Sequence, residues 1–211
     1  YGVSINEYLV AVYIWSVYTE CMHGMPSERP VRVAVPVNLR PYFNSITTKN
    51  FFVMVSAEFH PTKEIYTFEE VLKSVSESLR SQISRENLEK IFSYNVSNEK
   101  LLAARIVPLF LKNLAMRYVY TTSALANTAT VTNIGNISVS EEYRPYVEMF
   151  HAFLAMSKGQ HLKGTICSYG DTLVFSFSYD LTDTSVQRGF FRKIAADGIA
   201  VEIETNGVNY E

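Results

Sequence analysis

RVAVPVNLRPYFNSITTKNFFV, residues 32–53, joins two apolar runs through a polar Arg-Pro corner. Alternating valines in the first run have the period of two that is typical of a strand with one buried face. Pro36 interrupts this run without a backbone donor, which favours an edge position or a bulge. The second run, residues 50–59, is almost continuously apolar and predicts a strand buried on both faces. The quoted stretch contains no histidine, cysteine or carboxylate, so it indicates scaffold rather than catalyst.

Helical patterns flank these two strands. Ser4–Glu7 fits a capping box that opens a strongly apolar helix, which we expect to be buried on more than one side. Thr67–Glu70 fits a second capping box, and apolar residues then keep helical spacing as far as Ile83. Two further helices are predicted, one around residues 88–92 and one that begins near Pro108.

The second half of the chain has a different pattern. We predict a strand over 128–140, a strand over 146–156, a hairpin over 163–180, an amphipathic helix over 184–198 and a last strand over 199–205. The order of elements predicts an α/β or α+β fold, in which helices pack on a largely antiparallel or mixed sheet. We expect one domain that comprises residues 1–211.

Composition excludes several classes of protein. Hydrophobic residues make up 47% of the 211 residues and the net charge is −2, which is typical of a globular protein and argues against a nucleic-acid partner. No apolar run reaches the roughly 18 residues of a membrane span, so we expect no membrane partner. Cys21 and Cys167 are too few for a disulfide framework or a zinc site, so we expect free thiols, no metal and a cytoplasmic location.

Five segments in this order carry a family resemblance: SINEYLVAV, VPVNLRPYF with TTKNFF, TVTNIGNI, the GDTLVFSFSYD hairpin and VQRGFFRKIAADGI. Together they resemble the C-terminal half of the chloramphenicol-acetyltransferase-like superfamily, which includes alcohol acetyltransferases and condensation-domain proteins. The resemblance extends over nearly the whole chain. It implies a half-domain of that fold, and acyl transfer from acyl-CoA or an acyl carrier protein, as co-substrate, to a small alcohol or amine.

Enzymes of this superfamily have two similar halves around a tunnel, and their catalytic histidine lies in the N-terminal half within the motif H-H-x-x-x-D-G. None of the four histidines here, His23, His60, His151 and His161, is followed by x-x-x-D-G. We therefore expect the missing N-terminal half to be a partner of this chain, with self-association possible through an exposed apolar face. The alternative is a non-catalytic binding or scaffold module of the same fold.

The resemblance also implies candidate site residues. TVTNIG, residues 130–135, resembles the T-I-S-N-L-G strand of dihydrolipoamide acyltransferases, in which a serine donates a hydrogen bond to the oxyanion. Thr132 takes the place of that serine and can donate the same bond. Thr132 could instead be an ordinary strand residue, with Asn133 and Gly135 forming a bulge. Asn133 and Arg40 are substrate-binding candidates, although Arg40 could equally anchor a loop.

Overall fold

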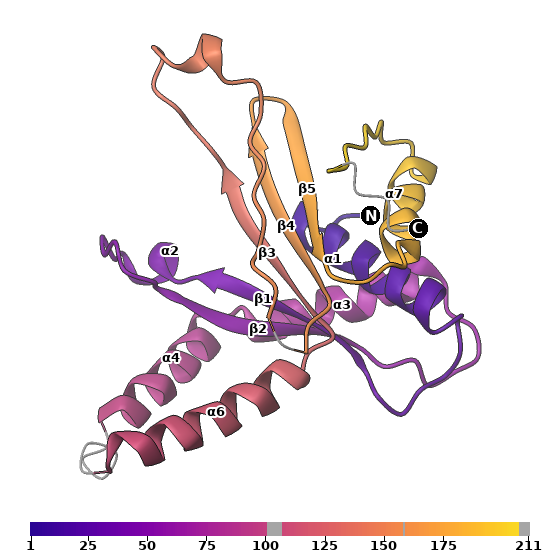
Figure 1. Ribbon diagram of the computed structural model, residues 1–211. Helices are drawn as coiled ribbons and strands as arrows, with labels where there is room; N and C mark the ends of the chain where they lie inside the picture. Colours follow the sequence, from indigo (N-terminus) through magenta and orange to yellow (C-terminus); the bar gives the residue numbers. More distant parts are fainter. Residues whose placement is uncertain (101–106, 158, 207–211) are drawn as a thin grey trace.

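The structure, a computed structural model, describes residues 1–100, 107–157 and 159–206, and its centre is a five-stranded sheet (Figure 1). The strand order is β2-β1-β3-β4-β5. The two outer pairs are antiparallel, whereas β3 runs parallel to both β1 and β4. The sheet is therefore mixed, as the sequence predicts. The strands are β1 (Val31–Asn38), β2 (Phe52–Phe59), β3 (Ala129–Asn136), β4 (Leu162–Tyr169) and β5 (Thr172–Tyr179).

The helices α1, α3 and α7 cover one face of this sheet, and α4 and α6 extend away from it (Figure 1). Both predicted capping boxes are present, since Ser4 and Thr67 each exchange hydrogen bonds with the glutamate three residues later. The helical elements are α1 (Ile5–Ser16), a π-helical turn η1 (Val17–Cys21), α2 (Arg40–Phe43), α3 (Phe68–Gln82), α4 (Arg85–Lys100), α6 (Leu109–Leu125), a 3-10 turn η2 (Arg144–Tyr146) and α7 (Ser185–Ala196).

The main core lies between the helices and the sheet. α1 contacts the sheet, α3 and α7, and its side chains from Val10 to Ile14 are completely buried. This confirms the prediction that α1 is buried on more than one side. Val131 of β3 and Ile166 of β4 point into the same core. Because side chains alternate along a strand, their neighbours Thr130, Thr132 and Thr165 lie on the face of the sheet that these helices leave uncovered.

The sheet divides into two arms between β1 and β3 (Figure 1). β1 pairs with β2 along its whole length, but with β3 at only two positions, Val33↔Ala129 and Ala34↔Thr130. Beyond these positions the β1–β2 arm and the β3–β4–β5 arm diverge. The pairing of β3 with β4 continues to Asn136, so the opening comes from the loss of contact between β1 and β3.

Pro36 accounts for the position of this opening. The backbone of Arg32 faces β3, because its nitrogen donates to Thr128 Oγ1 and its carbonyl accepts from the Thr128 nitrogen. Every second residue of a strand uses the same edge, so Ala34 and Pro36 also face β3. Pro36 has no N–H to donate, and pairing stops at Ala34, directly before it. Pro36 therefore lies on a locally unpaired edge, although β1 itself is an inner strand of the sheet.

Two predicted strands are not formed. Residues 146–156 begin at the last residue of the turn η2 and pair with no strand that the structure describes. Residues 199–205 continue past α7 without joining the described sheet. Alternating apolar residues suggest a strand only where a sheet edge is available to pair with them. Residues 147–157, which we name the strap, instead contact the helix-free face, where the Phe150 carbonyl accepts from Cys167 Sγ at 3.1 Å. After α7, Ile199 and Ile203 are exposed.

Candidate functional site

A polar row crosses the helix-free face of the β3–β4–β5 arm. Thr132 of β3 lies opposite Thr165 of β4, which lies opposite Ser176 of β5. A parallel row one step away contains Thr130 and Lys163. Hydroxyl groups on a rigid sheet are suitable donors for a developing oxyanion, because they need little reorganisation when the negative charge forms.

Thr165 is the most deeply buried member of this row. Its side chain is 2% exposed, and Oγ1 has no hydrogen-bond partner among the described residues. A buried hydroxyl without a partner destabilises a protein relative to an apolar group of the same shape. Such a hydroxyl directly beside half-buried Thr132 is therefore a candidate for function rather than for packing.

The predicted bulge is present immediately after Thr132. The register between β3 and β4 shifts between Asn133 and Gly135, which leaves Ile134 as the extra residue. Asn133 Oδ1 accepts a hydrogen bond from the Gly135 nitrogen at 2.8 Å, and Gly135 has the positive φ of +86° that glycine readily adopts. Asn133 thus stabilises the local turn of the strand. Its role as a substrate-binding residue stays a prediction.

Arg40 lies on the other arm of the sheet, in the short helix α2 after β1 (Figure 1). Its guanidinium donates to the carbonyl oxygens of Thr47 at 3.0 Å and Lys49 at 2.7 Å, and to Asn38 Oδ1 at 3.2 Å. These contacts tie together the loop between β1 and β2. The structure does not bring Arg40 into the polar row with Thr132, and contact of Arg40 with a substrate stays a prediction.

Lys163 is a feature of this face that the sequence analysis missed. Its side chain is buried, and Nζ donates to the Ala155 carbonyl at 2.8 Å and to Ser157 Oγ. Burial lowers the pKa of the Lys163 ammonium. Lys163 and Cys167 together hold the strap against β4. The signal that could have revealed this was a charged residue within the apolar hairpin pattern of residues 163–180.

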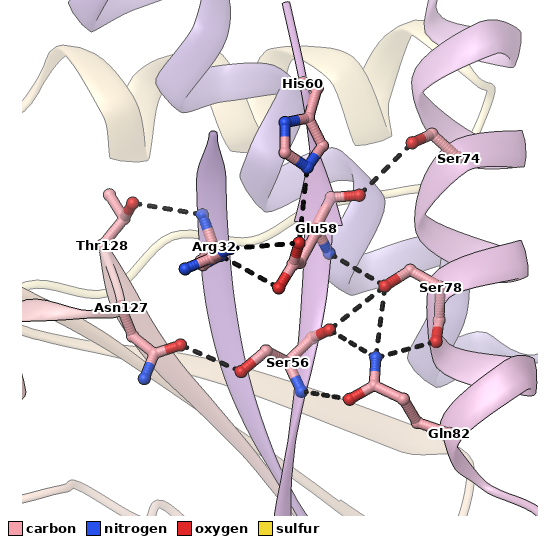
Figure 2. A network of polar contacts seen from close by, with 9 residues as sticks. All are labelled: Arg32, Ser56, Glu58, His60, Ser74, Ser78, Gln82, Asn127 and Thr128. Atoms are coloured by element: carbon pink, nitrogen blue, oxygen red, sulfur yellow. Dashed lines mark hydrogen bonds and ion pairs between the residues drawn. The ribbon is translucent and has the colours of Figure 1, made fainter. Parts of the chain in front are cut away.

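A second polar network lies on β1 and β2 (Figure 2). Arg32 Nε and Glu58 Oε1 are 2.9 Å apart, and Glu58 Oε2 lies 3.4 Å from His60 Nε2. Ser56 Oγ contacts Asn127 Oδ1 at 3.1 Å rather than the imidazole. The network therefore lacks the hydroxyl-to-histidine contact that a nucleophilic site requires, and it joins strands rather than forming a catalytic group.

The other histidines that contact carboxylates are exposed. His151 Nε2 lies 3.7 Å from Glu204 Oε2, and His161 Nδ1 lies 3.0 Å from Asp180 Oδ1. Within the described ranges, no three histidine, cysteine or carboxylate side chains gather as metal ligands would. Cys21 and Cys167 are both free thiols. No helix in the part of the chain that the structure describes is long and apolar enough to span a membrane.

The structure, unlike the sequence, matches known proteins. No family model and no curated protein matches the sequence. The epimerization domain from the third module of tyrocidine synthetase B matches with a TM-score of 0.53 and 11% identity, over 93% of this chain and 42% of that domain. The nonribosomal peptide synthetase FmoA3 matches with a TM-score of 0.55 and 17% identity, over 92% of this chain and 19% of that one.

These likenesses show the fold. The chain has a condensation-domain-like fold of the chloramphenicol acetyltransferase type, as the sequence resemblance implies. It spans less than half the length of either solved structure. At 11% and 17% identity the matches establish architecture alone, so the activity must be argued from the chemistry of the helix-free face.

Proposed function

We propose that this chain is the C-terminal half of an acyltransferase that moves an acyl group from a thioester to an alcohol or amine. The thioester donor is acyl-CoA or an acyl carrier protein. A second half, carrying H-H-x-x-x-D-G, supplies the catalytic histidine, and the two halves enclose the site. The observation that carries this proposal is the polar row on the helix-free face. In this row the buried hydroxyl of Thr165, which has no hydrogen-bond partner among the described residues, lies beside Thr132.

The chemistry assigns a separate task to each half. The histidine of the second half accepts the proton of the acceptor hydroxyl or amine while the acceptor atom attacks the thioester carbonyl carbon. The carbonyl π bond breaks, and negative charge develops on oxygen. Thr132 donates a hydrogen bond to this oxyanion from β3. Thr165, whose hydroxyl is buried in the free chain, becomes a second donor from β4 once the substrate displaces what covers it. The oxyanion then collapses, the carbon–sulfur bond breaks, and the thiolate takes the proton from the imidazolium.

The shape of the sheet supports this division. The α1, α3 and α7 layer covers one face, whereas the opposite face of β3 and β4 carries the polar groups. Beyond Pro36 the two arms of the sheet separate, so an extended substrate could approach β3 without displacing a neighbouring strand. We place the reaction in the cytoplasm, because free thiols at positions 21 and 167 suit a reducing compartment.

Free-thiol release from acetyl-CoA, measured with a panel of alcohols and amines, tests the proposal. We expect the purified chain to release thiol at the buffer rate, because none of its histidines lies in the required motif. We expect the complete protein with the second half to turn over, and to lose activity when the motif histidine is replaced by alanine. Turnover by this chain alone, or by the complete protein without that histidine, would overturn the proposal.

The second candidate is a non-catalytic binding or scaffold module with the same fold. The exposed contacts of His151 with Glu204 and of His161 with Asp180 favour it, because neither places an imidazole in the row with Thr132 and Thr165. Isothermal titration of the complete protein with a non-hydrolysable acyl-CoA thioether separates the two candidates. Binding without turnover of the matching thioester would support the module.

A further inference from the structure

A cavity lies at the far end of the β3–β4–β5 arm, away from the row with Thr132. It has a volume of about 450 Å³ and is bounded by the residues that follow β3, by the start of the strap and by the β4–β5 turn. This volume is within the range of small-molecule sites. The cavity also lies beside the carboxyl ends of two parallel strands, Asn136 of β3 and Tyr169 of β4, where ligands of open α/β sheets commonly bind.

Apolar side chains make up half of the residues that line the cavity. Ile137, Val139, Val147 and Tyr169 are half-buried and line it. The Tyr169 ring packs edge-on against Phe150 of the strap, with ring centroids 5.4 Å apart. This contact fixes the position of the Tyr169 ring in the cavity wall. Such walls suit an aromatic or aliphatic ligand of modest size.

A few polar groups could orient a ligand in the cavity. Asn136, Ser138 and Arg144 line it. Arg144 Nη1 lies 3.2 Å from Glu141 Oε1, but both side chains are exposed, at 61% and 81%. Exposed pairs of this kind contribute little, so the guanidinium is available to donate a hydrogen bond to an oxygen atom of a ligand.

The surrounding charges argue against an anionic ligand. Arg144 is the only cation among the cavity-lining residues, whereas the flanking exposed carboxylates are Glu141, Glu142, Glu148 and Asp171. Each of these carboxylates is one or two residues from a lining residue in the sequence, and nearby negative charges repel a carboxylate. We infer that the cavity binds a small uncharged aromatic or aliphatic molecule with a hydroxyl or carbonyl oxygen, which accepts a hydrogen bond from Arg144.

Binding of 1-naphthylmethanol to the chain tests this inference and requires no turnover, so it is independent of the proposed acyl transfer. We expect the alcohol to shift the backbone amide NMR signals of Tyr169 and Gly170, and to bind more tightly than 1-naphthoate. Val147→Trp fills the cavity and should weaken binding at least tenfold. Val201→Trp, at a partly exposed position after α7, is the matched control and should leave binding unchanged.

Arg144→Ala provides a second test if Val147→Trp fails to fold. Loss of one donor to an uncharged oxygen should weaken binding by about three- to tenfold. Tighter binding of 1-naphthoate than of the alcohol would overturn the inference. So would unchanged affinity in Arg144→Ala together with unchanged affinity in a folded Val147→Trp, or the absence of shifts at Tyr169 and Gly170 at millimolar alcohol.

Discussion

The side-chain amide of Gln82 on α3 pairs with the backbone of Ser56 on the outer strand β2 as a neighbouring strand would (Figure 2). Gln82 Oε1 accepts from the Ser56 nitrogen at 3.1 Å, and Nε2 donates to the Ser56 carbonyl at 2.8 Å. Ser78 and Ser74 extend this cover to the backbone of Glu58. An unpaired strand edge is a template for association with other chains, so α3 protects this edge with three polar side chains.

Gln82→Ala removes the central part of that cover. The Ser56 amide loses its partner, whereas the Ser56 carbonyl keeps the hydrogen bond from Ser78 Oγ at 3.1 Å. We therefore expect a loss of roughly 1 kcal/mol in unfolding free energy, the scale of one backbone hydrogen bond left unmade. Urea denaturation measures the change. Ser81→Ala, on the same helix at an exposed position, is the control. Equal stability of the two variants would show that Gln82 does not protect the edge.

Glu7 makes stability depend on pH through its contacts with α3. Burial by itself would raise the pKa of this carboxyl group. Hydrogen bonds from Arg80, Ser76 and Ser4 outweigh burial and lower the pKa of Glu7 to about 2. A lowered pKa in the folded state stabilises the protein above the ordinary value near 4.5, and this contribution disappears as the pH falls from there through about 2.

Glu7→Gln should therefore melt at a lower temperature than the wild type at pH 7, and the difference should shrink steadily below pH 4.5. The difference between the two proteins isolates Glu7 from other carboxylates. Melting followed by circular dichroism between pH 7 and pH 2 measures it. Glu69→Gln, an exposed substitution in the first turn of α3, should show no such trend. A difference in melting temperature that stays constant from pH 7 to pH 2 would contradict a lowered pKa of Glu7.

Exposed apolar side chains on helix α6 predict that the isolated chain self-associates. Phe110, Leu114 and Tyr118 recur every four residues on one side of the helix and are 70%, 68% and 72% exposed. Exposed apolar patches of this kind promote association, so we expect the chain alone to self-associate. The double variant Phe110→Lys with Leu114→Lys should remain smaller in light scattering across a concentration series. Ile46→Lys, at an exposed apolar position between β1 and β2, controls for added charge. A monomer at every concentration would rule the expectation out.

The sequence predicted the elements whose pattern is local. Both capping boxes, the two strands around the Arg-Pro corner and the bulge at Asn133 follow from neighbouring residues, and their positions are confirmed. The prediction that the second of these strands is buried on both faces is wrong, because β2 is an outer strand whose Phe52 and Met54 are 49% and 46% exposed. The strap was wrongly predicted as a strand, because alternation along residues 146–156 does not reveal whether a sheet edge is available. The pairing of Thr132 with Thr165 could not be predicted, since the register of parallel strands 33 residues apart depends on the packing of the whole domain.

Thr165→Val tests whether the polar row is kept for function. Valine matches threonine in shape and removes a hydroxyl that has no partner in the described part of the chain, so the isolated chain should gain up to about 1 kcal/mol of stability. Thr132→Val, at a half-buried strand position, should change stability little. In the complete protein each variant should lose turnover roughly 10- to 1000-fold, the scale for one oxyanion donor.

Thr130→Val is the matched comparison on the same face of β3. Its hydroxyl lies 3.2 Å from Gln160 Oε1, so we expect it to lose stability while keeping turnover. Chemical denaturation ranks the three variants by stability, and free-thiol release ranks them by turnover. If Thr132 and Thr165 are oxyanion donors, the two rankings are opposite. Thr165→Val would be the most stable and among the least active. A stabilised Thr165→Val with full turnover would show that this hydroxyl is a packing defect, and would leave Thr132 as the single donor on this face. Equally small losses of turnover at Thr132 and Thr130 would show that this chain does not carry the oxyanion site.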